Sequence, residues 1–126
     1  MKKIYVTHSS NFDFKSNLYD PLRASSLNKE FELILPHEKM DEPFNSRKLF
    51  DDGCDLILAE VSFPSTGQGI ELGWANAIKI PIICIYKRKS KISGGLKVIT
   101  KNFIEYETSQ DLIKKLKEKL ANFENE

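Results

Sequence analysis

A short glycine-rich segment in the middle of the chain carries the residue types that could do chemistry. Ser65, Gly67 and Gly69 alternate along it, and Glu71 follows two residues later. A glycine turn that opens a helix exposes amide N–H groups and the positive end of the helix dipole, which can hold an anion. We expect this helix to begin near Gly69, so that the Glu71 carboxylate lies in its first turn and stays ionised, as a nucleophile must. Such a carboxylate could attack a sugar carbon in glycosyl transfer, although on these residues alone a glutamate that caps a glycine turn is the favoured interpretation.

The elements that must position this segment alternate along the chain. Apolar runs rich in β-branched residues predict strands, and longer stretches with helical spacing predict helices between them. That alternation is typical of a doubly wound α/β fold with a parallel sheet, and a length of 126 residues fits one domain over residues 1–126. We expect strands over residues 3–7, 32–35, 55–61, 81–86 and 103–106, and helices over residues 14–27, 45–52, 69–78 and 109–123.

The predicted sheet limits where a ligand can bind. Residues 55–61 are nearly continuous in apolar side chains, which is typical of a central strand covered on both faces. Open parallel sheets bind ligands beyond the carboxyl ends of their strands. The candidate loops are therefore residues 8–14, 36–44 and 62–68.

Composition excludes several classes of function. Nineteen basic and eighteen acidic residues give a net charge of +1, so the chain has no overall field for nucleic acid or a membrane surface. We expect a cytoplasmic protein, because no apolar run reaches the length of a membrane span and the chain becomes polar at His8. Cys54 and Cys84 lack metal-binding spacing and are expected to be reduced core thiols. Neither a metal nor another cofactor is expected.

The run from residue 55 to residue 75, DLILAEVSFPSTGQGIELGWA, resembles the signature of the nucleoside 2-deoxyribosyltransferase superfamily. Its form Pro-Ser-x-Gly-x-Gly-x-Glu-Leu-Gly is closer to the 2'-deoxynucleoside 5'-phosphate N-hydrolases than to the transferases. Residues 5–10 and 81–93 show a weaker similarity. The resemblance implies a flavodoxin-like fold with a five-stranded parallel sheet, and a small-molecule nucleotide as substrate.

The resemblance also implies roles for the glycine-rich segment. Glu71 would attack the anomeric carbon and form a glycosyl-enzyme intermediate, while Ser65 and the amides of Gly67 and Gly69 would bind the 5' end of the substrate. The transferases carry an aspartate at the position of Ser65. A carboxylate there would repel a 5'-phosphate, whereas a hydroxyl can donate to it, so Ser65 favours a nucleoside 5'-monophosphate. Ser93 aligns with a serine that reaches the phosphate of the neighbouring subunit, which implies a homodimer.

Other parts of the site follow from the same resemblance. The first loop lies over the sugar in the family, and His37 is placed where it could stack on or hydrogen-bond to the base. Tyr5 could equally be a strand residue packed in the core. The predicted substrate-binding residues are Tyr5, His8, Ser9, Ser10, His37, Asn45, Ser65, Gly67, Gly69 and Ser93.

One feature of the family is missing. Relatives usually have an aspartate eight residues before the position of Asp55 that orients or protonates the leaving base, but this sequence has Arg47 there. Asp51 or Asp52 would take that role only if the helix were shifted. Proton transfer of this kind typically contributes about a hundred- to ten-thousandfold in rate.

Three residues near the signature are expected to be structural. Glu60, at the end of a strand, would accept backbone hydrogen bonds, and Leu72 and Trp74 would pack against the sheet or a dimer partner. Alternatives to nucleotide hydrolysis are base exchange between deoxynucleosides, cleavage of another N-glycoside such as a ribonucleotide or a nicotinamide dinucleotide, and a nucleotide-binding module without catalysis.

Overall fold

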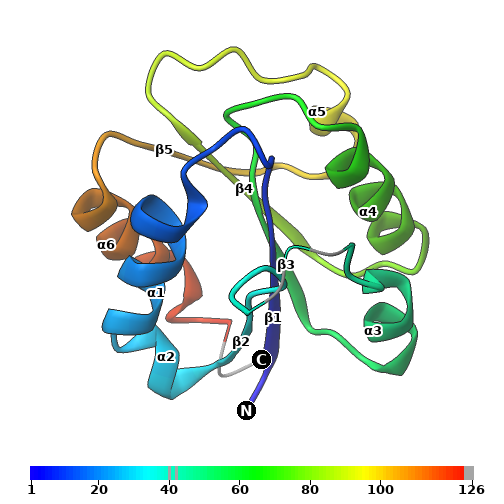
Figure 1. The fold of residues 1–126 in the computed structure, drawn as a ribbon, viewed down its shortest axis with the longest axis horizontal. Helices are drawn as coiled ribbons and strands as arrows, with labels where there is room; N and C mark the ends of the chain where they lie inside the picture. Colours follow the sequence, from blue (N-terminus) through cyan, green and yellow to red (C-terminus); the bar gives the residue numbers. More distant parts are fainter. Residues whose placement is uncertain (40, 42, 124–126) are drawn as a thin grey trace.

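The computed structural model describes residues 1–39, 41 and 43–123. Its centre is a five-stranded sheet in which neighbouring strands are parallel, in the order β2-β1-β3-β4-β5. The predicted flavodoxin-like, doubly wound fold is confirmed (Figure 1). The strands are β1 (Lys3–Thr7), β2 (Glu32–Ile34), β3 (Leu56–Glu60), β4 (Ile82–Lys87) and β5 (Asn102–Tyr106).

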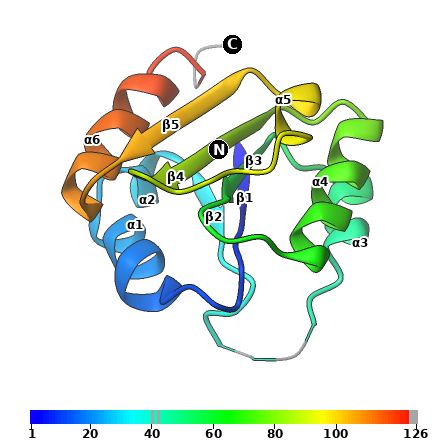
Figure 2. The ribbon, with the colours of Figure 1, turned by 90° about the horizontal axis from the view of Figure 1, so that it is seen from above.

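Helices cover both faces of the sheet (Figures 1 and 2). One face carries α1 (Asp20–Ala24), α2 (Leu27–Glu30) and α6 (Ser109–Leu120). A π-helical segment, η1 (Lys15–Tyr19), directly precedes α1. The other carries α3 (Ser46–Asp52), α4 (Thr66–Ala77) and α5 (Leu96–Ile99).

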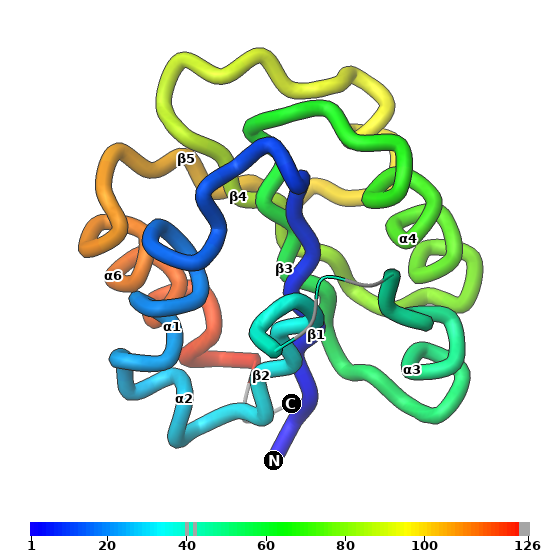
Figure 3. Tube along the Cα trace, viewed as in Figure 1, coloured from blue at the N-terminus to red at the C-terminus, as the bar shows by residue number. Residues whose placement is uncertain are grey.

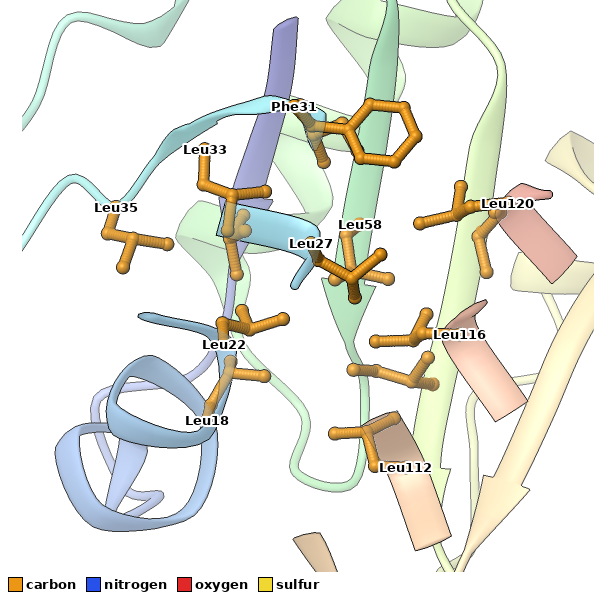
Figure 4. Packing of buried hydrophobic residues seen from close by; sticks show 14 of the residues in the cluster. Leu18, Leu22, Leu27, Phe31, Leu33, Leu35, Leu58, Leu112, Leu116 and Leu120 are labelled. Atoms are coloured by element: carbon orange, nitrogen blue, oxygen red, sulfur yellow. The ribbon is translucent and has the colours of Figure 1, made fainter. Parts of the chain in front are cut away.

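Each face of the sheet has its own hydrophobic cluster. On the α6 side, Leu112 and Leu116 meet Leu58 of β3, with Leu27 of α2 between the layers (Figure 4). On the α4 side, Leu72 packs in a second cluster with residues of β3 and β4. All five residues of β3 are buried, as the apolar run predicts for a central strand.

Successive side chains of β1 point to opposite faces of the sheet. Ile4 and Val6 belong to the α6-side cluster and Tyr5 to the α4-side cluster. Because side chains alternate along a strand, Thr7 shares the face of Tyr5. The carboxyl ends of β1 and β3 lie at one edge of the sheet, where the chain turns toward η1 and α4 (Figure 3). This edge can therefore bring β1 side chains to the start of α4.

The predicted strands agree with the structure to within one residue at each end, but the helices differ more. The expected helix over residues 14–27 is broken into η1, α1 and α2. Pro21 stands at the start of α1, and Ser25 is extended (φ −89°, ψ 166°), which ends that helix. α6 ends at Leu120 rather than at residue 123, and α5 was not expected at all.

Three further sequence predictions concern the two cysteines, the loop over residues 36–44 and membrane-spanning segments. Cys84 is buried and Cys54 is partly buried, and both are free thiols, as expected. Residues 40 and 42 of the predicted loop over residues 36–44 lie outside the described residues. No helix among the described residues is long and apolar enough to cross a bilayer.

Candidate active site

Two hydroxyl groups of β1 hold the carboxylate of Glu71. The phenolic hydroxyl of Tyr5 donates to Oε2 of Glu71 at 2.6 Å, and Oγ1 of Thr7 donates to Oε1 at 2.6 Å. Both donors are buried, with 2% of the surface of each residue exposed, while Glu71 is partly exposed. Each carboxylate oxygen therefore has its own short, charge-assisted hydrogen bond, which fixes its orientation and stabilises its charge.

The hydroxyl of Tyr5 keeps its proton at neutral pH and therefore remains a hydrogen-bond donor. Burial, and then the negative charge of Glu71, raise the pKa of Tyr5 far above its usual range. A phenol that does not ionise cannot repel the carboxylate. Tyr5 therefore contacts the Glu71 carboxylate and also packs in the core, since its ring stacks with Phe44 in the α4-side cluster.

Glu71 does not lie in the first turn of its helix, contrary to the sequence prediction. Ser65 is the N-cap of α4, with its Oγ accepting from the amide of Gln68 at 3.4 Å, so the helix begins at Thr66. Glu71 consequently lies in the second turn, and the helix dipole acts mainly within the first. The two β1 hydroxyls, rather than the helix end, hold this carboxylate.

A cavity of about 450 Å³ opens in front of the carboxylate, a volume within the usual range for small-molecule sites. We call it the Glu71 cavity. It brings together seven of the predicted site residues: Tyr5, His8, Ser10, His37, Ser65, Gly67 and Glu71. The other lining residues are Thr7, Pro36, Pro43, Phe44, Ser46, Gln68, Ile70 and Trp74.

Four predicted site residues do not line this cavity. Ser9 is buried and its hydroxyl accepts from the amide of Asn11 at 3.1 Å. Asn45 is the N-cap of α3, where its Oδ1 accepts from the amide of Lys48 at 3.2 Å. Both side chains serve local backbone geometry.

Gly69 and Ser93 lie in a second, smaller groove of about 270 Å³. The amide of Gly69 already donates to the carbonyl of Ser65 at 3.1 Å, as the fourth residue of a helix does, so it is not available to a phosphate. Ser93 is exposed in the loop after β4. Within one chain, Ser93 therefore does not face Glu71.

The two histidines belong to one hydrogen-bonded network. Nδ1 of His8 lies 3.1 Å from the carbonyl of Ser9, and Nε2 lies 2.7 Å from the hydroxyl of Tyr19. A carbonyl can only accept, so Nδ1 carries the proton and Nε2 accepts from Tyr19. The same tyrosine oxygen accepts from the amide of His37 at 3.2 Å. Burial lowers the pKa of His8, which favours the neutral ring that this pattern of contacts requires.

The α3 helix supplies no carboxylate to the Glu71 cavity. Arg47 is exposed, and its guanidinium lies 5.9 Å from the centre of the Trp74 ring. Asp51 and Asp52 are exposed and do not line the cavity, so a shifted helix does not bring either of them in. From this helix the cavity receives Ser46, which is 1% exposed.

Sequence reasoning missed two important residues. Thr7 could have been found, because it is two residues from Tyr5 on a predicted strand and must share its face. Trp74 was expected to pack away from the substrate, but it lines the cavity with 38% of its surface exposed. It follows Glu71 by three residues and Ile70 by four, which puts all three on one side of α4.

Comparisons with known proteins identify the family of this chain. No family model matches the chain. A curated protein of Syntrophotalea carbinolica, named "Putative 2'-deoxynucleoside 5'-phosphate N-hydrolase 1", is 36% identical over 108 residues, covering 71% of this chain and 74% of that protein. A protein of the same name from Methanosarcina barkeri is 40% identical over 40 residues, which are 32% of this chain and 25% of that protein.

A solved structure adds the fold. The CMP N-glycosidase BcmB of Clostridium botulinum has a TM-score of 0.69 and 27% identity to this chain, covering 94% of this chain and 100% of that one. The names of these relatives describe enzymes that break bonds of N-glycosyl compounds. The identity, the coverage and the common fold show that this chain is an enzyme acting on N-glycosyl compounds and belongs to the 2'-deoxynucleoside 5'-phosphate N-hydrolase family, within the nucleoside 2-deoxyribosyltransferase superfamily.

Proposed function

We propose that this enzyme hydrolyses the N-glycosidic bond of a nucleoside or 2'-deoxynucleoside 5'-monophosphate, releasing the free base and the sugar 5-phosphate. One observation carries the proposal: the Glu71 carboxylate is held on both oxygens, at 2.6 Å each, at the wall of a cavity that also contains the N-terminus of α4. The names of the relatives, one a deoxynucleoside 5'-phosphate hydrolase and one a CMP N-glycosidase, support the same substrate class.

The 5'-phosphate binds at the start of α4. Ser65 and Gly67 line the cavity there, and the amides of the first helical residues have no partner within the helix. The hydroxyl of Ser65 accepts from Gln68 and keeps its own proton for donation to a phosphate oxygen. Together with the helix dipole, these groups favour an anion.

The reaction takes two displacements. A carboxylate oxygen of Glu71 attacks C1' of the sugar, the C1'–N bond breaks, and the base leaves with that electron pair and takes up a proton. Water then attacks C1', the ester bond to Glu71 breaks, and the water loses a proton as the carboxylate is restored. Tyr5 and Thr7 keep the carboxylate oriented toward the sugar before the first step.

The leaving base lies between the aromatic walls of the cavity. Trp74 and Phe44 offer ring faces for stacking, and His37 is the titratable side chain that we assign to the base. Because α3 contributes no carboxylate, we place proton transfer to the base at His37 rather than on that helix.

We also propose that the enzyme is a homodimer, in which Ser93 of each subunit reaches the phosphate in the other. Ser93 is exposed and lies on the side of α4 away from Glu71, which suits a contact outside its own cavity. Sedimentation equilibrium of the wild type checks this. A monomer at enzyme-assay concentration would refute it.

The test is chromatographic detection of free base from each ribonucleoside and deoxyribonucleoside monophosphate. Wild type, Glu71→Gln and the exposed control Glu105→Gln are compared at equal concentration, after circular dichroism shows all three to be folded. Base release by wild type and the control, but not by Glu71→Gln, is expected. Release only in the presence of a second free base would indicate base exchange, and tight binding without any release would indicate a nucleotide-binding module.

A further inference from the structure

A buried carboxylate that takes no part in the proposed chemistry organises the turn leading into α4. Glu60, the last residue of β3, is 1% exposed. Its Oε1 accepts from the amide of Ser62 at 2.7 Å, and its Oε2 accepts from the hydroxyl of Ser62 at 3.0 Å and from the hydroxyl of Tyr106. The prediction that Glu60 accepts backbone hydrogen bonds at a strand end is confirmed.

These contacts tie three strand ends together. Tyr106 is the last residue of β5. The hydroxyl of Ser62 accepts from the amide of Lys87, the last residue of β4, at 2.8 Å. The start of the turn after β3 is thus fixed through Glu60 and Ser62 to β4 and β5, the next two strands in the sheet.

The far end of the same turn is also fixed to Glu60, through its backbone. Nε2 of Gln68, in the first turn of α4, donates to the carbonyl of Glu60 at 2.8 Å. The amide of Gln68 in turn meets the Oγ of Ser65 at 3.4 Å. One residue therefore holds both ends of the segment that contains Ser65 and Gly67.

We propose that Glu60 is a positioning residue for the 5'-phosphate subsite: its carboxylate sets the turn over residues 61–65 so that Ser65 and the first amides of α4 face the phosphate of the substrate. The inference rests on the proposed function for the presence of a phosphate at that place. Glu60 itself does not line the Glu71 cavity.

The chemistry of the three donors explains why an acceptor is needed here. All three groups facing the carboxylate are donors, and a buried amide or hydroxyl left without an acceptor is destabilising. Replacement by methionine, of similar length, would leave the amide of Ser62 unpaired and release the turn. Replacement by glutamine keeps one acceptor for that amide, while the hydroxyls can rotate to accept from its NH₂ group.

The experiment measures two ligands by calorimetry. The probes are 2-deoxyribose 5-phosphate, which carries the phosphate, and 2'-deoxycytidine, which does not. The proteins are wild type, Glu60→Met, Glu60→Gln, Ser62→Ala and Leu116→Ala. Leu116 lies in the α6-side cluster, so its variant controls for a general loss of stability.

We expect Glu60→Met to weaken binding of 2-deoxyribose 5-phosphate about tenfold, because this is the effect of losing one net hydrogen bond. The affinity for 2'-deoxycytidine should stay within about twofold of the wild-type value. Glu60→Gln should bind the phosphate probe nearly as wild type does, and Leu116→Ala should bind both probes normally despite a lower Tm. If Glu60→Met does not fold, Ser62→Ala replaces it, with an expected loss of about threefold for the phosphate probe alone.

Unchanged affinity for the phosphate probe, or equal losses for both probes, would overturn the inference. Absence of phosphate-dependent binding in wild type would also overturn it. Wild type that binds the phosphate probe in the expected pattern but releases no base from any nucleotide would leave the positioning role intact and refute the proposed hydrolysis. The two failures are therefore distinguishable.

Discussion

The phenolic oxygen of Tyr5 lies 2.6 Å from Oε2 of Glu71, and this contact joins the first strand to the helix that carries the proposed nucleophile. Thr7 makes the matching contact to the other oxygen from the same face of β1. Glu71 is therefore held by residues 64 and 66 positions away in the sequence. Its geometry depends on the sheet more than on its own helix.

Removing either donor should slow base release without greatly changing substrate affinity. We expect Tyr5→Phe and Thr7→Val each to lower kcat about 10- to 100-fold, because a hydrogen bond to a charged group contributes about 1.5–3 kcal/mol and the freed carboxylate leaves its attack geometry. Thr7→Ser keeps a hydroxyl and serves as the matched control. Equal kcat values for Thr7→Val and Thr7→Ser would contradict a role for this hydrogen bond.

Trp74→Ala should raise KM about tenfold, since stacking of a base on an aromatic ring contributes about 1–3 kcal/mol. Binding of 2-deoxyribose 5-phosphate, which has no base, should stay the same in calorimetry. Trp74→Phe keeps a ring face and should lie between the two. A loss of affinity for the sugar phosphate as well would mean that Trp74 supports the cavity in general.

Ser46→Ala should stabilise the protein by about 1 kcal/mol. The Ser46 hydroxyl is buried close to the phenol of Tyr5, yet among the described residues no hydrogen bond of good geometry reaches it. Alanine removes that buried, unpaired group at little cost in packing. Urea unfolding measures the change, and a loss of stability of similar size would show that the hydroxyl is satisfied in solution.

His8 should make the fold sensitive to acid. Because burial lowers its folded-state pKa below the ordinary value of 6.5, the unfolded chain binds a proton that the folded chain rejects. Stability from this source is complete above pH 6.5 and is lost as the pH falls through and below it. His8→Asn, which keeps a donor for the Ser9 carbonyl, should lose less unfolding free energy between pH 7 and pH 5. Parallel pH profiles for the two proteins would contradict this.

The sheet could be predicted from the sequence because its signal is local. The β-branched runs around Ile57 and Ile83 fix strand positions, and parallel order follows from the helices between them. The start of α4 was placed too late because Gly67 and Gly69 are poor helix formers, whereas the Ser65 cap begins the helix before them. The short α5 has too few residues for a periodic signal.

The site could be predicted only in part for a different reason. Ser65, Gly67 and Glu71 are close in sequence, so their grouping is visible in one motif. The contacts of Thr7 and Trp74 depend on strand register and helix phase, which set distances between segments far apart in the chain. The role of Asn45 was hidden likewise, since an N-cap side chain that bonds its own helix looks the same in sequence as one that faces a ligand.

The place of β1 in the sheet has a consequence for the durability of the enzyme. Tyr5 is paired with Ile34 of β2 on one side and with Ile57 of β3 on the other, and Thr7 is paired with Ala59. Such interior strand amides exchange with solvent only through the largest opening motions of a domain. The proposed nucleophile is therefore held by an interior part of the sheet, and heat inactivation of the enzyme should coincide with global unfolding rather than precede it.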